Sequence, residues 1–108
     1  MEENVRGLVS FEGGKSLGLL KPRETYLNFT SENKLVRFVG IFDPNYDGKD
    51  VAVCHVLEET NTTEEKYSYR SEGLYKKVQE KVYPAETVLI ISEGEGTEDD
   101  PFQVEVGI

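Results

Sequence analysis

The sequence predicts a mainly β fold, organised as a small β-barrel or sandwich with at most one short helix. Three observations favour this class: short runs of β-branched and aromatic residues, alternation of apolar and polar positions, and Gly, Asp, Asn and Pro between the runs. About seven or eight such runs recur at regular spacing, which is typical of small barrels and sandwiches. A chain of 108 residues suits one core, so residues 1–108 are interpreted as a single β-rich domain with an acidic C-terminal hairpin over 82–108.

The elements follow in order along the chain. Residues 5–11 alternate and predict a first strand, the two glycines of 12–15 predict a hairpin turn, and 17–21 would form the return strand. Asp47-Gly48 is the strongest hairpin signal, so 43–49 is expected to be a turn between two strands. Residues 58–65 are polar and predict a loop. Further strands are expected at 26–29, 35–42, 51–57, 66–70, 87–92 and 102–106.

One segment, 74–83, shows a helical rather than a strand period. Its apolar residues recur about every 3.6 positions, and Pro84 would end the helix. Glu72 also precedes Lys76 by four positions, a favourable helical pair. The sequence therefore predicts one helix here. The most β-like runs supply the expected core, which consists of Phe38, Ile41, Val51, Val53, Leu89 and Ile91.

The charge is strongly negative and uneven. The formal net charge is −9, and from Val82 onward there are seven acidic residues and no Lys or Arg. Nucleic acids are bound by basic surface, so no nucleic-acid partner is expected. No apolar run reaches the ~18 residues of a membrane helix, and the N-terminus lacks the basic and apolar regions of a secretory signal. A single cysteine suits a reducing compartment, so we expect a cytoplasmic protein.

Gly13-Gly14-Lys15-Ser16 matches only the end of a phosphate-binding loop. The full pattern needs a glycine where Val9 stands and a long helix after Ser16, yet Pro22 follows six residues later. We interpret this segment as a plain hairpin turn.

Asp43-x-Asn45-x-Asp47-Gly48 matches the first half of a calcium loop. The twelfth position, where a bidentate acid is required, is Cys54, and the ninth is Val51. A hairpin turn is the preferred interpretation and a weak cation site the alternative.

The sequence does not supply the complete set of side chains that a catalytic site needs. Cys54-His55 is the only pairing of a nucleophile with a base, and neighbours on a strand point to opposite faces. With one His and one Cys, neither a nucleophile–base–orienter set nor a zinc site can be assembled. We therefore expect no enzyme activity, no cofactor and no resident metal.

Two groups of residues remain as candidates for contact with a protein partner. Tyrosine is common at interfaces, and residues 93–100 hold five carboxylates in eight positions, which suit a solvated turn, a cation site or a docking site for a basic partner. The candidate contact residues are Tyr67, Tyr69, Tyr75, Glu95, Glu98, Asp99 and Asp100.

Several short motifs recur in a familiar order: Tyr26 with Phe29, then Val39-Gly40-Ile41, then Asp50 to Val53, then Tyr69-Arg70, then Leu74 to Val78. In this order, residues 26–78 resemble a short bacterial SH3-like domain of unknown function, although 68–71 read Ser-Tyr-Arg-Ser where that domain has Trp-Val-Arg-Pro. The resemblance implies an SH3-like barrel.

Two further stretches carry resemblances. Gly94 to Phe102 has the form Gly-x-Gly-Thr-x-x-x-Pro-aromatic, and this turn resembles one found in surface modules of Gram-positive bacteria and their phages. Residues 34–57, where a strand leads into an Asp-Gly turn, resemble part of phage capsid decoration proteins. Both imply a bacterial or phage origin by analogy.

The expected function is a non-catalytic protein–protein binding or structural module of bacterial or phage origin. One alternative is a phage virion component such as a capsid decoration protein, which would place the chain in the virion. Another is an acidic inhibitor that mimics nucleic acid. The expected partner is a protein, with a homo-oligomer as one form of it, and neither nucleic acid nor a membrane.

Overall fold

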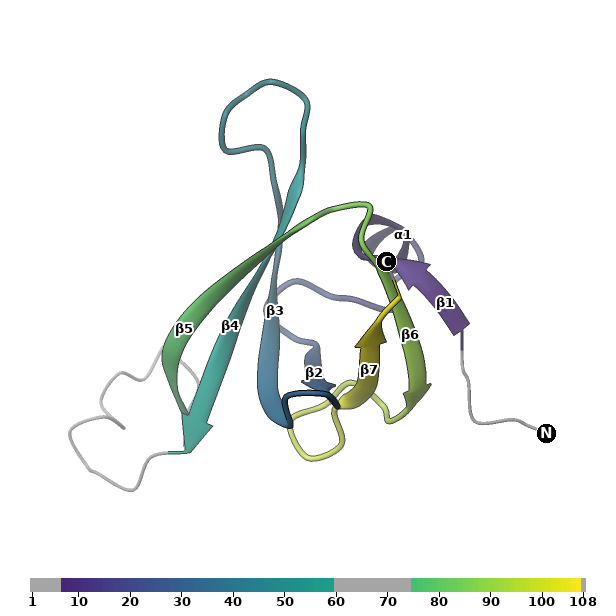
Figure 1. Cartoon of the computed structure of the whole chain (residues 1–108), viewed down its shortest axis with the longest axis vertical. Coiled ribbons are helices and arrows are strands. Elements are labelled where there is room, and N and C mark those ends of the chain that lie inside the picture. Colours follow the sequence, from purple (N-terminus) through teal and green to yellow (C-terminus); the bar gives the residue numbers. More distant parts are fainter. Residues whose placement is uncertain (1–6, 60–74, 108) are drawn as a thin grey trace.

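A computed structural model of the chain describes residues 7–59 and 75–107 (Figure 1). The described residues form seven strands and one short helix, so the fold is mainly β as predicted. The elements are β1 (Gly7–Ser10), α1 (Phe11–Ser16), β2 (Tyr26–Phe29), β3 (Lys34–Phe42), β4 (Val51–Glu59), β5 (Tyr75–Pro84), β6 (Val88–Glu93) and β7 (Phe102–Val106).

The seven strands form one sheet in the order β1-β6-β7-β2-β3-β4-β5. All neighbours are antiparallel except β2 and β7, which are parallel. The sheet does not close on itself, because β1 and β5 remain at its two edges among the described residues. The fold is therefore an open, curved sheet and not the closed barrel that was expected.

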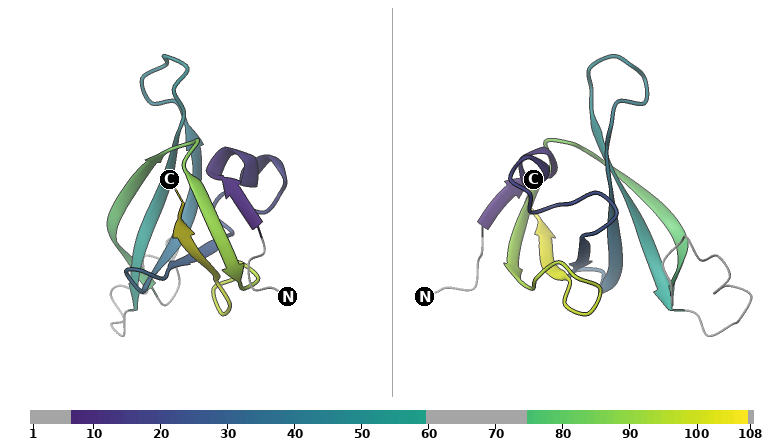
Figure 2. Two further views of the ribbon diagram at one scale, coloured as in Figure 1. Left: turned by 45° about the vertical axis from the view of Figure 1, so that its right-hand side comes forward. Right: turned by 180° about the vertical axis from the view of Figure 1, so that it is seen from behind.

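Three β-bulges bend this sheet. The pairing register skips Val39 in β3, Val78 in β5 and Ser92 in β6. Each extra residue kinks its strand and increases the local twist. Figures 1 and 2 show the result: β3, β4 and β5 form one side, β1 and β6 the other, and β2 and β7 lie between them. The hairpin that joins β3 to β4 projects beyond the body of the sheet.

The core lies on the inner side of the curve and draws on both halves of the sheet. Strands β2, β3, β4, β6 and β7 all contribute buried apolar side chains to one cluster. Phe11 of α1 adds a fully buried ring from the end of the sheet, and it stacks on Phe38 and on Tyr83 with ring centroids 6.0 and 5.4 Å apart. β5 is one edge strand of the sheet, and α1 comes directly after β1, the other edge strand. These ring contacts therefore join the two sides of the curved sheet.

The predicted core is partly confirmed. Phe38, Leu89 and Ile91 are buried as expected. Val51 and Val53 are only half-buried, which corrects the prediction, because the inward positions of β4 are the alternate residues Ala52, Cys54 and Val56. Ile41 is half-buried and packs against the core.

The expected hairpin at 12–15 is wrong, since Phe11–Ser16 is the helix α1. The Ser10 side chain caps this helix by accepting a hydrogen bond of 2.9 Å from the Gly13 N–H. The predicted return strand at 17–21 is also absent from the described structure. The buried ring of Phe11 and the cap of Ser10 together outweigh the low helix propensity of Gly13 and Gly14.

The expected helix at 74–83 is wrong as well. Residues 75–84 form β5, paired with β4 along its full length, and residue 74 lies outside the described residues. Of the predicted loop at 58–65, Glu58 and Glu59 belong to β4 instead, and residues 60–65 lie outside the described residues. The strand expected at 66–70 lies outside the described residues. The other predicted strands are present among the described residues with bounds shifted by no more than two residues, and residues 5 and 6 of the first one lie outside the described residues.

Candidate functional site

The acidic turn between β6 and β7 is a fixed structure rather than a loose loop. Three backbone N–H groups, from Glu95, Gly96 and Thr97, converge on the Asp100 carbonyl at 2.9, 2.9 and 3.2 Å. The Tyr26 N–H also donates to the Gly96 carbonyl at 2.8 Å, which anchors the turn to β2. Gly96 has φ +86°, and a Cβ there would lie 2.7 Å from the ring of Phe102, so only glycine fits.

This turn lies within electrostatic range of the start of β5. Partial burial raises the pKa of Tyr75, and the negative charges of Glu98, Glu59 and Asp99 raise it further. Tyr26 of β2 belongs to the same neighbourhood. Tyr75 therefore lies within electrostatic range of two of the predicted acidic contact residues, Glu98 and Asp99, although they are far apart in sequence. We call Tyr26, Tyr75, Glu98 and Asp99 the tyrosine–acid face.

The other predicted contact residues are less informative. Glu95 and Asp100 are exposed in the same turn, while Tyr67 and Tyr69 lie outside the described residues. Tyr26 was not singled out from sequence, because nothing in its strand distinguishes it from a core-edge tyrosine. Its place beside the acidic turn follows only from the pairing of β2 with β7 and the hydrogen bond to Gly96.

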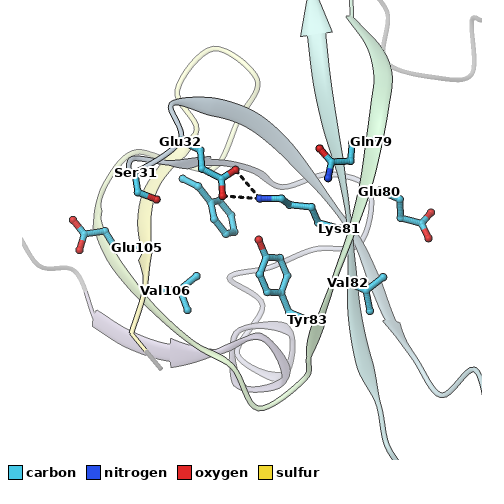
Figure 3. A pocket seen from close by; sticks show the side chains of 10 residues that line it. Ser31, Glu32, Gln79, Glu80, Lys81, Val82, Tyr83, Glu105 and Val106 are labelled. Carbon is cyan, nitrogen blue, oxygen red and sulfur yellow. Dashed lines mark hydrogen bonds and ion pairs between the residues drawn. The ribbon is translucent and has the colours of Figure 1, made fainter.

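A second surface feature is a groove of about 530 Å³ on the inner side of the sheet's open edge. One wall is residues 79–83 of β5, and the other is formed by Ser31 and Glu32 of the β2–β3 turn with Glu105 and Val106 of β7. Phe29 completes the lining. We call this the β5 groove. Figure 3 shows Lys81 reaching across it to Glu32, with the Tyr83 side chain beside them.

Lys81 is held firmly inside the groove. Its Nζ donates to both carboxylate oxygens of Glu32, at 2.6 and 2.7 Å, and lies 5.9 Å from the centre of the Phe29 ring. The hydrogen bond to Glu32 raises the pKa of Lys81, although partial burial opposes it. The ammonium form is thus favoured, whereas a nucleophilic lysine needs a lowered pKa.

The other nucleophile types near the groove are also kept protonated. Burial raises the pKa of the Cys54 thiol to about 12, against a smaller opposing effect of Lys81. Burial likewise raises the pKa of Tyr83. Thiolate and phenolate are the reactive forms of these side chains, so this part of the molecule disfavours covalent chemistry.

Cys54 and His55 lie on opposite faces of β4, as the strand period predicts. Cys54 is fully buried, whereas His55 is half-buried and its Nε2 lies 3.7 Å from Glu80 Oε1. The two side chains therefore do not share a proton.

In the oxygen-rich turn of 43–49, the Asp43 carboxylate is already bound by backbone N–H groups of the same turn. Asp43 accepts from the Asp47 N–H at 3.2 Å through Oδ1 and from the Gly48 N–H at 2.7 Å through Oδ2. Such bonds are typical of Asp at a turn. Over residues 7–59 and 75–107, no three acidic, His or Cys side chains are grouped so as to hold a metal ion.

Comparisons of the chain with protein families, with curated proteins and with solved structures found no match. In the part of the chain that the structure describes, no helix has the length and apolar character required to span a bilayer.

Proposed function

We propose that this protein is a non-catalytic module that binds another protein, of bacterial or phage origin, and that it acts in the cytoplasm or, if phage-encoded, in the virion. The observation that carries the proposal is the tyrosine–acid face, where the Tyr26 N–H binds the acidic turn at the Gly96 carbonyl and Tyr75 lies within electrostatic range of Glu98 and Asp99. Tyrosine combines an apolar ring with a polar tip and is enriched at interfaces. The carboxylates beside it favour a basic partner.

The chemistry of the groove supports the non-catalytic part of this proposal. Lys81 is paired with Glu32, and Cys54 is buried with a pKa raised to about 12. An enzyme would instead hold such groups in their reactive forms.

The test reverses two charges of the face and compares the effect with an equal reversal elsewhere. Glu98→Lys with Asp99→Lys is the test variant, and Glu12→Lys with Glu86→Lys is the matched control, because these acids are exposed and lie in other parts of the fold. Both variants change the net charge equally, so a difference between them reports location. Proteins retained from an extract of the source organism are compared, and the retained partner is then purified and titrated by calorimetry.

We expect the test variant to weaken the purified complex at least roughly tenfold, and the control to leave it within about a factor of three. Equal retention by both variants would show that this face is not the contact. A capsid protein as the partner would assign the virion role. A DNA-handling enzyme that is displaced by DNA, with steep salt dependence, would assign the role of nucleic-acid mimic.

A further inference from the structure

The β5 groove follows the edge of a strand rather than one face of the sheet. Its wall contains five consecutive residues of β5, from Gln79 to Tyr83. Successive side chains of a strand point to opposite faces, and Figure 3 shows Lys81 and Tyr83 on one side of β5 and Glu80 and Val82 on the other. An unbroken run of lining residues is therefore what a groove along the strand's free edge would give. No described strand pairs with that edge.

The direction of the backbone groups along this edge follows from the pairing with β4. The Ala85 N–H donates to the Asp50 carbonyl at 3.1 Å, and the register continues from there through Tyr83 opposite Ala52 and Lys81 opposite Cys54. In an antiparallel pair, hydrogen-bonded and non-hydrogen-bonded positions alternate. Glu80 and Val82 therefore direct their N–H and C=O groups outward, along the groove.

The two halves of β5 differ in how well they are protected against strand addition. The first half carries the exposed lysines Lys76 and Lys77 and then the bulge at Val78. Edge lysines and bulges are the devices by which proteins prevent edge pairing. The second half has no bulge, and its one lysine, Lys81, is turned into the groove and bound by Glu32.

The charge around the groove is negative. Three glutamates and one lysine are among its lining residues, which leaves a formal charge of −2. Glu32 neutralises Lys81, and Glu80 lies 3.4 Å from Lys77. Glu105, on the opposite wall, accepts a long hydrogen bond of 3.5 Å from Thr30 and makes no ion pair with a described residue. It is thus the carboxylate best placed to receive a cation from outside.

We propose that residues 79–83 accept an extended, basic segment of a partner protein as an added strand in the β5 groove. Backbone hydrogen bonds would join the segment to Glu80 and Val82, and a Lys or Arg side chain would reach Glu105. In this mode of recognition the main chain gives affinity and the side chains give specificity. The site is separate from the tyrosine–acid face, so either can fail without the other.

The test uses a defined probe: a blocked eight-residue peptide of alternating Lys and Val, with an alternating Glu and Val peptide as its comparison. Affinity is measured by fluorescence anisotropy at about 0.15 M salt, where screening beyond about 8 Å reduces non-specific attraction. Binding is located by amide hydrogen exchange. We expect the basic peptide to bind at least about tenfold more tightly than the acidic one and to slow exchange at Glu80 and Val82.

Two pairs of variants separate strand addition from general attraction to an acidic protein. Val82→Pro removes one outward N–H without breaking a bond to β4, and Val82→Thr keeps that N–H. Glu105→Lys reverses the charge at that one position and brings the formal charge of the lining residues from −2 to zero, and Glu86→Lys makes the same change at an exposed residue outside the groove. We expect Val82→Pro and Glu105→Lys each to weaken peptide binding roughly three- to tenfold, while the two controls bind normally.

Several results would overturn the proposal. These are equal binding of the two peptides, unchanged exchange at Glu80 and Val82, or an equal effect of Glu86→Lys and Glu105→Lys. The last comparison decides the matter even if Val82→Pro fails to fold. Self-association of the protein in sedimentation, abolished by Glu105→Lys, would identify a second copy of the chain as the occupant and contradict a basic segment.

Discussion

Phe38 and Phe42 are the same residue type on the same strand, yet they have opposite environments. Phe38 is fully buried and stacks on Phe11, whereas Phe42 is 48% exposed where the β3–β4 hairpin leaves the sheet. The bulge at Val39 and the projection of the hairpin separate these environments. Residue type alone does not distinguish the two rings.

We expect Phe38→Ala to lower the free energy of unfolding by about 3–5 kcal/mol, because it deletes a buried ring and leaves a cavity. Phe42→Ala is the matched control and should cost less than about 1.5 kcal/mol. Urea denaturation of both variants under one set of conditions measures the difference. A loss below about 1 kcal/mol for Phe38→Ala would mean that β3 is peripheral to the core.

Among the secondary-structure elements, α1 depends on its cap more than on its composition. Its six residues include Gly13 and Gly14, and the Ser10 hydroxyl satisfies the Gly13 N–H. We expect Ser10→Ala to destabilise the protein by about 1 kcal/mol in urea denaturation. Ser16→Ala, at the exposed end of the same helix, should be nearly neutral. Equal effects of the two substitutions would contradict the capping role.

The β3–β4 turn and the acidic turn are the two oxygen-rich turns at which calcium binding can be tested. Both oxygens of Asp43 already accept backbone hydrogen bonds, and calcium requires six to eight converging oxygen ligands. We therefore expect millimolar calcium to raise the melting temperature by less than about 2 °C, whereas a hundredfold excess over Kd at a true site would give about 10 °C or more. A large calcium-specific rise, lost in Asp47→Ala or in Asp99→Ala, would contradict this and identify the loop.

The β5 strand shows how pairing overrides a local pattern. Leu74, Val78 and Val82 fit a helical period, but β4 offers hydrogen-bond partners to residues 75–84, and a helix of about ten residues is marginal alone. In the strand, Val82 is 53% exposed, while Tyr83 packs against the core and Lys81 lies over the ring of the buried Phe29. The prediction failed because apolar residues on an edge strand need not face the core.

For the whole molecule, several groups with raised pKa values are expected to make stability fall at alkaline pH. Burial raises the pKa of Cys54 from 9.0 to about 12, so the folded state keeps a proton that the unfolded chain loses above pH 9. The raised pKa values of Tyr83 and Lys81 act in the same direction. The contribution of Cys54 is therefore fully present below pH 9 and is lost as pH rises toward 12.

We expect the free energy of unfolding, measured in urea at a series of pH values, to fall between pH 9 and 12. Cys54→Ala should lose less stability over this interval, because the group that titrates differently has been removed. At about pH 8 the native thiol should react slowly with a thiol reagent and rapidly once unfolded. Fast reaction of the native protein would contradict the burial of Cys54.

The sequence by itself determined the fold class, most strand positions, the hairpin at 43–49 and the separation of Cys54 from His55. These are local properties: β-branched and aromatic runs, the Asp-Gly turn and the alternation of a strand each depend on neighbouring residues. It also indicated that Tyr75 and the acids of 93–100 were worth attention, from residue type alone. Ser10 is a residue type that caps helices, but the two glycines that follow it favoured the prediction of a hairpin turn over that of a helix.

Only the tertiary structure decided which of these pieces meet. The pairing of β2 with β7 places the acidic turn beside Tyr26, and the pairing of β5 with β4 leaves one edge of β5 facing a groove. The order of strands, the three bulges and the identity of the open edge depend on contacts between residues distant in sequence, which no local pattern encodes. For that physical reason the β5 groove and its Glu32–Lys81 pair had no signal in the sequence.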